Sequence, residues 1–480
     1  MSMKRVFSAI LIASLLAVQC GTAVSAEETG ADAAFSESVD VVEVEKTAEE
    51  LAAEEKNTQY ETTADTNSLA GWPQGPNVCA ASAIVMDMDS RAILYAKKAD
   101  EAHYPASITK LLTTLVALEN GDLSDTITFS EDSINILSWD DAHIGMKPGE
   151  QISLNDALYA VLLASANEVS YAVAENVGTK MGGGYETFIQ EMNDRAVELG
   201  CTGSHWVNPN GLHDDQHYTT AHDMAVIASA VYQREEFRTI MKSLEYRIPP
   251  TNLTDVERVF QQNHKMLWEG NDYYYEYCTG GKTGYTDQSG TTLVTMADNG
   301  TLRLAAVVLV DYGVDAYTDT RAMMDYVFNN FSKVSLKEQK TSEYIESFED
   351  KDAHVVLPAG ITFSQVECEL ISDKDGISEK KSGAKERQGT AVYTYQGQEV
   401  GRAEVILAKE FFKSKETGTT DSEKQDTAEK KKSPFWIWFL AIGATVFGIA
   451  VLFYCYLQYL RRERARRRRR RQRRRRKCKK

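Results

Sequence analysis

The sequence predicts an α+β protein with three parts: a large domain that combines an antiparallel sheet with a helical region, a small all-β domain, and a C-terminal transmembrane helix. Strand-like stretches pair around tight turns near the start of the large domain, at 83–88 and 92–95, and again near its end, at 291–296 and 303–310. Apolar residues between these pairs recur with helical period. The stretch 435–457 contains no charged side chain.

The composition is that of a globular protein, because 43% of the 480 residues are hydrophobic and 26% are charged. The formal net charge of −17 hides an uneven distribution. Residues 461–480 hold 13 Arg and 3 Lys against the single Glu463, a local charge of +15, so the rest of the chain carries −32. A body this acidic repels phosphates, which argues against binding to nucleic acid.

Residues 1–26 have the features of a secretory signal peptide. Lys4 and Arg5 precede an apolar run, and Val24-Ser25-Ala26 supplies the small residues at which a signal peptidase cuts. We therefore expect the mature chain to be exported.

Residues 434–460 are predicted to cross the membrane once. At 1.5 Å per residue, the 23 residues from Phe435 to Leu457 span roughly 35 Å. The basic residues that follow outnumber the three lysines before the span, so the tail is expected in the cytoplasm and the large domain outside it. The tail is also expected to attract anionic lipid.

The domain boundaries follow from changes in composition. Residues 27–70 hold 13 acidic side chains and few aromatic ones, which favours a disordered stalk. The expected order is 1–26 signal peptide, 27–70 acidic stalk, 71–335 large α+β domain, 336–410 small β domain, 411–433 linker, 434–460 transmembrane helix and 461–480 basic tail.

Ser107 and Lys110 are the first candidates for chemistry. The pattern S-x-x-K occurs at Ser107, Ser378 and Ser382, but only Ser107 follows a proline and precedes an apolar helical run. Lys110 would lie one helical turn from Ser107, where a desolvated amine could take the hydroxyl proton. The alternative is a helix-capping serine with a solvated lysine.

Two further motifs carry polar groups. Ser165 and Asn167 follow a buried apolar helix, where they can relay a proton and bind a substrate amide, or merely bond free carbonyls at the helix end. The strand-like Lys282-Thr283-Gly284-Tyr285 offers a charge and a hydroxyl to an anion, and the N–H groups of Ser107 and Tyr285 could form an oxyanion hole. Its alternative is a glycine-rich surface turn.

These motifs, in this order, resemble those of the low-molecular-mass penicillin-binding proteins, the serine-type D-alanyl-D-alanine carboxypeptidases. They are Pro105-Ala106-Ser107-Ile108-Thr109-Lys110, Ser165-Ala166-Asn167 and Lys282-Thr283-Gly284-Tyr285-Thr286. The resemblance covers about residues 75 to 335 and implies the fold that β-lactamases and DD-peptidases share. A departure is Glu168-Val169-Ser170, where the family more often has Asp-Ala-Ala.

The resemblance also implies roles. Ser107 would attack the D-Ala-D-Ala bond of peptidoglycan stem peptides, Lys110 would be the base, and Ser165 with Lys282 would help protonate the leaving D-alanine. Substrate binding would fall to Asn167, Lys282, Thr283, Gly284, Tyr285 and Arg321. Arg321 would hold the terminal carboxylate, or else form an i,i+4 pair with Asp325. β-Lactams are implied as inhibitors, and no cofactor is implied.

Three other interpretations compete. His213, His217 and His222, with nearby aspartates, have metal-like spacing, but the family has a structural loop here and no metal is predicted. A β-lactamase usually needs a glutamate-held water, and no glutamate sits in a recognisable version of that loop. The third interpretation is a non-catalytic penicillin sensor or a wall-binding scaffold. A sensor would need a signalling domain inside the cell, and the roughly 20 residues after the span are too few for one.

Overall fold

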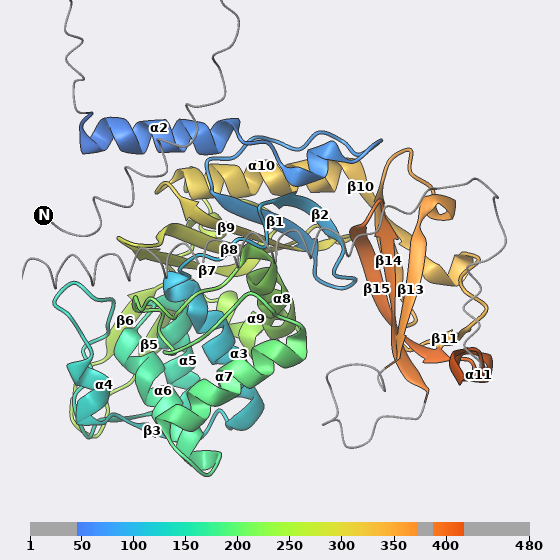
Figure 1. Ribbon diagram of the computed structural model, residues 1–480. Coiled ribbons are helices and arrows are strands. Elements are labelled where there is room, and N and C mark those ends of the chain that lie inside the picture. Colours follow the sequence, from blue (N-terminus) through green and yellow to red (C-terminus); the bar gives the residue numbers. More distant parts are fainter. Residues whose placement is uncertain (1–45, 373–386, 417–480) are drawn as a thin grey trace, which may run out of the picture. The chain divides into compact units, whose positions relative to one another are not determined.

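The computed structural model describes residues 46–372 and 387–416, which form two compact units (Figure 1). The larger unit runs to Lys340 and also contains Asp350–Leu370 and Ala391–Ala403. The two units therefore do not divide at a single boundary at residue 335, as predicted, because later segments of the chain return to the larger unit. The predicted signal peptide, transmembrane helix and basic tail lie outside the described residues. Within the described part of the chain, no helix combines the length and the apolar character needed to cross a membrane.

A five-stranded antiparallel sheet organises the larger unit. Its strand order is β2-β1-β9-β8-β7, with bounds β1 Ser82–Asp87, β2 Ile93–Lys97, β7 Cys278–Thr286, β8 Gly290–Asp298 and β9 Arg303–Asp311. β1 pairs with β9 along its full length, so the first hairpin joins the last one as predicted. The side chains of β1 are all buried because α10 (Asp315–Asn330) covers one face of the sheet and α8 (Ala221–Tyr232) the other (Figure 1).

The face of the sheet covered by α8 carries the predicted helical region. Its helices are α3 Lys110–Asn120, α4 Glu131–Asn135, α5 Leu154–Leu163, α6 Asn167–Lys180, α7 Tyr185–Leu199, α8 and α9 Glu235–Met241. Short strand pairs join them: β3 Thr126–Thr128 with β4 Gln151–Ser153, and β5 Glu245–Ile248 with β6 Arg258–Gln261. Ser153 caps α5 by accepting a hydrogen bond from the Asp156 N–H, as its spacing predicted.

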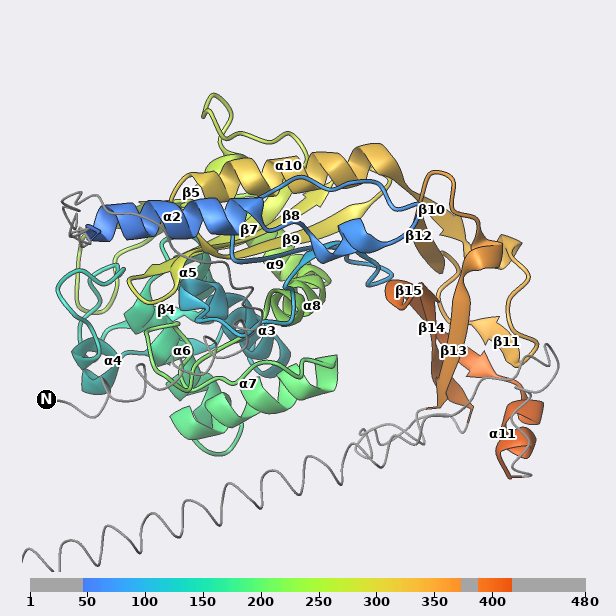
Figure 2. The same cartoon turned by 45° about the horizontal axis from the view of Figure 1, so that its top comes forward.

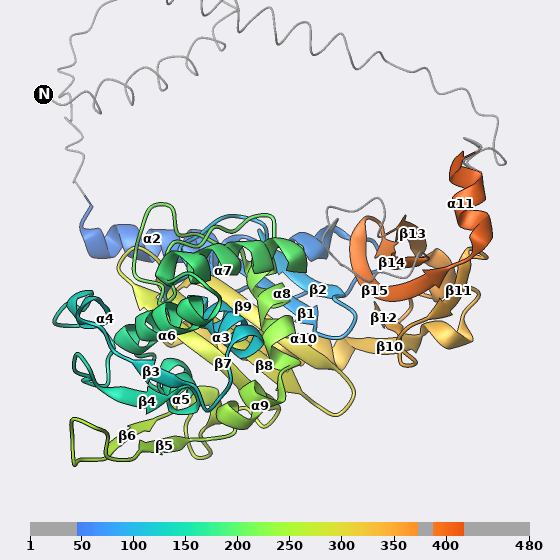
Figure 3. The same cartoon turned by 90° about the horizontal axis from the view of Figure 1, so that it is seen from below.

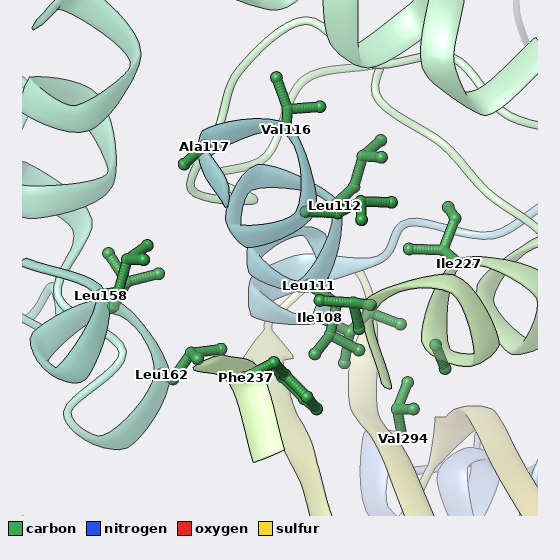
Figure 4. Packing of buried hydrophobic residues seen from close by; sticks show 14 of the residues in the cluster. Ile108, Leu111, Leu112, Val116, Ala117, Leu158, Leu162, Ile227, Phe237 and Val294 are labelled. Carbon is green, nitrogen blue, oxygen red and sulfur yellow. The ribbon is translucent and has the colours of Figure 1, made fainter. Parts of the chain in front are cut away.

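Helix α3 is the centre of this region, and α5, α6, α7 and α8 surround it (Figure 3). Residues 110–118 are buried without exception. Apolar side chains of α3 belong to one buried cluster with Leu158 and Leu162 of α5, Ile227 of α8 and Val294 of β8 (Figure 4). A helix fixed on all sides also holds the turn that leads into it, and the candidate Ser107 lies in that turn.

The predicted disordered stalk is wrong for its second half. Helix α2 (Ala48–Glu61) and the short helix η1 (Asp65–Ser68) lie within it, and α2 runs beside the start of α10 (Figures 1 and 2). Thr47 and Glu50 form a reciprocal capping box, Lys56 pairs with Asp315, and Lys97 Nζ donates to the Gln59 carbonyl over 2.6 Å. Alanine and glutamate favour helix, and these contacts fix it to the unit.

The strands that follow α10 form two further sheets. β10 (Phe331–Ser335) pairs with β12 (His354–Pro358), and a four-stranded sheet follows in the order β11-β15-β14-β13. Their bounds are β11 Ile345–Phe348, β13 Glu367–Ser372, β14 Gln388–Tyr395 and β15 Gln398–Leu407. Short helices η4 (Leu336–Glu338) and η5 (Phe363–Gln365) lie between these strands, and α11 (Lys409–Glu416) occupies the start of the predicted linker.

A buried ion pair joins β12 to β1 within the larger unit. His354 Nε2 lies 3.1 Å from Asp87 Oδ2, which also accepts bonds from the N–H and hydroxyl of Ser90. Burial favours the neutral form of Asp87, but His354 and Ser90 together hold the pKa of its carboxyl below the ordinary value. Burial also opposes charge on His354, yet the Asp87 carboxylate raises the pKa of this imidazole. The pair is therefore charged on both sides at mildly acidic pH.

Asp87, Asp89 and His354 are the one group in the described chain whose potential metal-ligand atoms lie within 4.8 Å of one another. Their charges are already matched by the protein, because Asp89 pairs with both Arg303 and Lys333. These residues therefore form salt bridges that stabilise the packing of the strands.

Replacing His354 with Gln is expected to destabilise the larger unit by about 3 kcal/mol near pH 5.5, because Asp87 would remain buried without its counter-charge. The raised pKa of His354 means that its contribution is complete below about pH 6.5 and is lost as the pH rises through the folded-state pKa. The loss relative to wild type should therefore shrink toward pH 8.5. Urea unfolding at both pH values measures it, and an equal loss at both would contradict the charged pair.

Candidate active site

Ser107 lies in η2 (Ala106–Thr109), the turn that leads directly into α3. Its neighbour Ala106 has φ of 50°, a left-handed conformation that alanine adopts only when its surroundings enforce it. Gly211 supplies part of that enforcement: its own φ is +84°, and a Cβ there would lie 1.9 Å from the Ala106 carbonyl oxygen. The strained turn presents Ser107, half-buried, to a pocket.

A buried histidine fixes the same turn. Nδ1 of His217 accepts the Val207 N–H over 3.1 Å, so its proton lies on Nε2, which is 2.9 Å from Thr109 Oγ1. Thr109 in turn donates to the Ala106 carbonyl over 2.8 Å. Burial lowers the pKa of His217 to about 3, so the ring is neutral and structural.

The other two histidines of the metal-like spacing have separate partners. His213 packs edge-on against the ring of Tyr104, and Nδ1 of His222 lies 3.0 Å from Asp100. The three rings therefore serve three different contacts, and the structure does not bring them together as a metal site among the described residues.

Lys110 is fully buried, and its Nζ has three neighbours. Ser107 Oγ lies at 3.0 Å, Asn167 Oδ1 at 2.7 Å and the Asn210 carbonyl oxygen at 2.5 Å. The two carbonyl oxygens can only accept, so they take both N–H bonds of a neutral amine, and its lone pair is left facing the Ser107 hydroxyl. No local pattern predicts the contact with Asn210, because this residue lies 100 positions beyond Lys110.

Burial lowers the pKa of Lys110 well below its ordinary value, and the positive charge of Lys282 lowers it further. The amine can therefore be neutral at physiological pH. A neutral amine within hydrogen-bonding distance of a hydroxyl can take its proton, which is the requirement for a serine nucleophile.

Lys282 provides a second buried amine from the middle of β7. Its Nζ donates to Ser165 Oγ over 2.9 Å and to the Thr283 carbonyl over 2.7 Å. Burial lowers its pKa to about 7. Ser165, in the turn between α5 and α6, has φ of 60° and is the other strained residue of the site. The hydroxyl of Ser165 thus links one side of the site to an amine that titrates near neutrality.

Asn167 begins α6, although the sequence had suggested that it ends the preceding helix. Its side-chain oxygen holds Lys110, which leaves the Nδ2 group for a ligand. The next residue, Glu168, is buried, and its Oε1 accepts the Ile144 N–H over 2.7 Å, so it anchors the loop before β4. Burial raises the pKa of this carboxyl.

A pocket of about 410 Å³ opens beside these groups. Ser107, Ser165, Thr283, Gly284 and Tyr285 line it, so residues from all three sequence motifs meet there. β7 is the edge strand of the sheet and passes so close to η2 that a Cβ on Gly284 would lie 2.9 Å from the Ser107 nitrogen. Glycine is required at that position, and the edge of β7 remains available beside Ser107.

Arg321 does not join this pocket, so its predicted place at the site is wrong. Its guanidinium donates to the Tyr274 carbonyl and lies over the ring of Tyr275, and it lines a separate pocket. The alternative pairing with Asp325 is not formed either, because Asp325 accepts the Tyr275 hydroxyl over 2.8 Å. Ala316 and Tyr317 line the Ser107 pocket, and Arg321 lies a full helical turn farther along α10.

Comparison with known proteins agrees with this geometry. Residues 70–312 match the peptidase S11 family, described as D-alanyl-D-alanine carboxypeptidase. The D-alanyl-D-alanine carboxypeptidase DacF of Bacillus subtilis is 29% identical over 359 residues, which cover 70% of this chain and 86% of the relative. DacB2 of Mycobacterium tuberculosis is 31% identical, with 52% of this chain and 82% of the relative covered.

Among solved structures, the Streptomyces K15 DD-transpeptidase is similar, with 24% identity and a TM-score of 0.49. The match covers 54% of this chain and all of that chain. The family match spans the strands, the helical region and all three motifs that meet at the pocket. The chain therefore belongs to the peptidase S11 family of serine D-alanyl-D-alanine carboxypeptidases.

Proposed function

We propose that this protein removes the terminal D-alanine from peptidoglycan stem peptides through an acyl-enzyme on Ser107, and that penicillin acylates the same serine. One observation carries the proposal: the Lys110 amine lies 3.0 Å from Ser107 Oγ, with both of its N–H bonds taken by carbonyl oxygens. This arrangement aims the lone pair of the amine at the nucleophile. Family membership supports the same activity.

In the acylation step, Lys110 takes the Ser107 proton as Oγ bonds to the carbonyl carbon of the penultimate D-alanine. The N–H groups of Ser107 and Tyr285 would hold the resulting oxyanion. The tetrahedral intermediate then collapses, the C–N bond breaks, and the leaving nitrogen takes a proton delivered through Ser165, which Lys282 contacts directly. The proton that Lys110 took replaces the one given up by Ser165 and Lys282, so Lys110 is neutral again when water attacks the acyl-enzyme. Lys110 then takes the water's proton and returns it to Ser107 Oγ as the ester bond breaks.

The substrate peptide would extend along the edge of β7. An edge strand offers unpaired N–H and C=O groups to an extended chain, and β7 is such a strand beside Ser107. Thr283, Gly284 and Tyr285 lie on this stretch, and Asn167 Nδ2 would bind a substrate carbonyl from the opposite side. The β-lactam ring places its reactive amide in the same position.

We also propose that the enzyme acts outside the cytoplasm on a single membrane anchor. The support comes from the sequence: the signal-like residues 1–26, the uncharged stretch within 434–460, and the excess of basic residues after it. The basic tail at 461–480 would then contact anionic lipid of the inner leaflet.

Replacing Ser107 with Ala is expected to lower D-alanine release by about a thousandfold or more, because the nucleophile is lost. Intact-mass analysis after benzylpenicillin treatment should show one adduct in the wild type and none in the variant. Ser378→Ala is the matched control, since it removes the hydroxyl of another S-x-x-K motif and should keep the adduct. An adduct that persists in Ser107→Ala would contradict the proposal, and retained wall function without catalysis would indicate a scaffold.

The pH profile of kcat/KM is expected to be bell-shaped. Activity should rise as Lys110 loses its proton, and should fall above about pH 7 as Lys282 loses the proton that it supplies through Ser165. In Lys282→Arg the guanidinium keeps its charge, so the alkaline limb should disappear from any remaining activity. Penicillin acylation followed from pH 5 to 10 gives a second profile. An alkaline limb that does not move would rule out Lys282 as its source.

Deleting residues 434–480 is expected to release the protein from the membrane fraction while it keeps penicillin binding, because the site lies within 105–317. Deleting only 461–480 should leave it in the membrane. Labelling with fluorescent penicillin after fractionation measures both. Membrane retention of the longer deletion would refute the proposed anchor.

A further inference from the structure

The Ser107 pocket has an unusual balance of charge for so acidic a chain. Among the described residues that line it, Lys265 is the one with a formal charge, and no Asp or Glu is present. The remaining lining is hydroxyl, backbone and apolar side chain. In a protein of net charge −17, a pocket with a cation and no carboxylate favours an anionic group on the ligand.

The two buried amines of the site are not available to that anion. Lys110 and Lys282 are 0% and 1% exposed, and each amine is already bonded to side-chain and backbone oxygens. Neither lines the pocket. Lys265 is exposed, so a ligand that enters from solvent can reach its amine.

Lys265 is held at the pocket without being neutralised. It begins η3 (Lys265–Leu267), next to His264, whose buried ring lies 3.0 Å from Thr295 Oγ1 of β8. Its Nζ lies 5.6 Å and 5.8 Å from the ring centroids of Tyr273 and Tyr317, which stack on each other. Within the described chain no carboxylate comes within 4.0 Å of this amine. Aromatic faces attract a cation but leave it free to pair with an anion.

The proposed substrate carries its anion close to the reacting bond. Ser107 attacks the carbonyl before the last residue, so the terminal carboxylate lies within one residue, about 4 Å, of the reacting centre. Ser107, Thr283 and Lys265 all line the pocket of about 410 Å³. Arg321 lies in another pocket and cannot serve.

We propose that Lys265 binds the C-terminal carboxylate of the substrate, with the Thr283 hydroxyl as a second donor, and thereby restricts the enzyme to peptides with a free terminal carboxylate. This inference rests on the proposed carboxypeptidase function. It assigns the selection of substrate to a lysine between β6 and β7, outside the three motifs.

Lys265→Gln, Lys265→Arg and the control Lys242→Gln test the inference. Lys242 is exposed at the end of α9 and does not line the pocket. Each protein is given a peptide that ends in D-Ala-D-Ala and the same peptide with a C-terminal amide. Lys265→Gln should lower kcat/KM for the acid by about tenfold to a hundredfold, since a charge-assisted contact is lost. Its kcat/KM for the amide should stay within about twofold of wild type, and Lys265→Arg should keep most of the preference for the acid.

Unchanged kcat/KM for the acid in Lys265→Gln would overturn the inference, as would an equal loss on acid and amide, which would mean a structural role. A wild type that releases neither D-alanine from the acid nor D-alaninamide from the amide would refute the carboxypeptidase function itself. Acylation by benzylpenicillin and by its methyl ester then decides the role of Lys265, because only the former carries the carboxylate. Wild type should prefer the free acid, and Lys265→Gln should lose that preference.

Discussion

The site depends on the buried amine of Lys110, whose neighbours leave it able to take a proton from Ser107. Lys110 Nζ is surrounded by two carbonyl oxygens and one hydroxyl, and only the hydroxyl can give a proton. Three separate segments supply these partners: the first turn before α3, the start of α6, and the loop that contains Asn210. The packing of α3 among its neighbours holds these three segments in place. A shift of one ångström would break the hydrogen bonds of the Lys110 amine.

The second buried amine, Lys282, helps to lower the pKa of the first, Lys110. Lys282 enters from β7, on the opposite side of the pocket, and its charge adds to the burial that lowers the pKa of Lys110. Its own pKa of about 7 reflects burial alone, because no carboxylate compensates it. Of the two strained residues, Ala106 precedes the Ser107 hydroxyl that Lys110 contacts, and Ser165 carries the hydroxyl that Lys282 contacts. Strain of this kind persists only where the surrounding structure is rigid, which fits the central place of α3.

Particular errors show the limits of reasoning from the sequence. The acidic residues before residue 70 predict disorder by their number. Two local signals nevertheless indicate helix α2: the capping box of Thr47 and Glu50, and the run of alanine and glutamate. What the sequence could not provide was the partner for Lys56, which lies on α10, more than 250 residues later. The predicted place of Arg321 at the site is wrong for a related reason. Helical periodicity shows which residues share a face of a helix, but it does not show which turn of the helix borders a pocket.

The sequence by itself determined the strands of the central sheet, the helix that follows Ser107, and the three motifs, because each is written in local spacing and in the alternation of apolar residues. It determined that Ser107 and Lys110 lie within one helical turn of each other, since they are three positions apart. Only the tertiary structure decided that the Asn210 carbonyl completes the Lys110 environment, that Lys265 and not Arg321 borders the pocket, and that His217 supports the turn. These contacts join segments far apart in the chain, and their distances depend on how β7 and the helices pack, which no local pattern records.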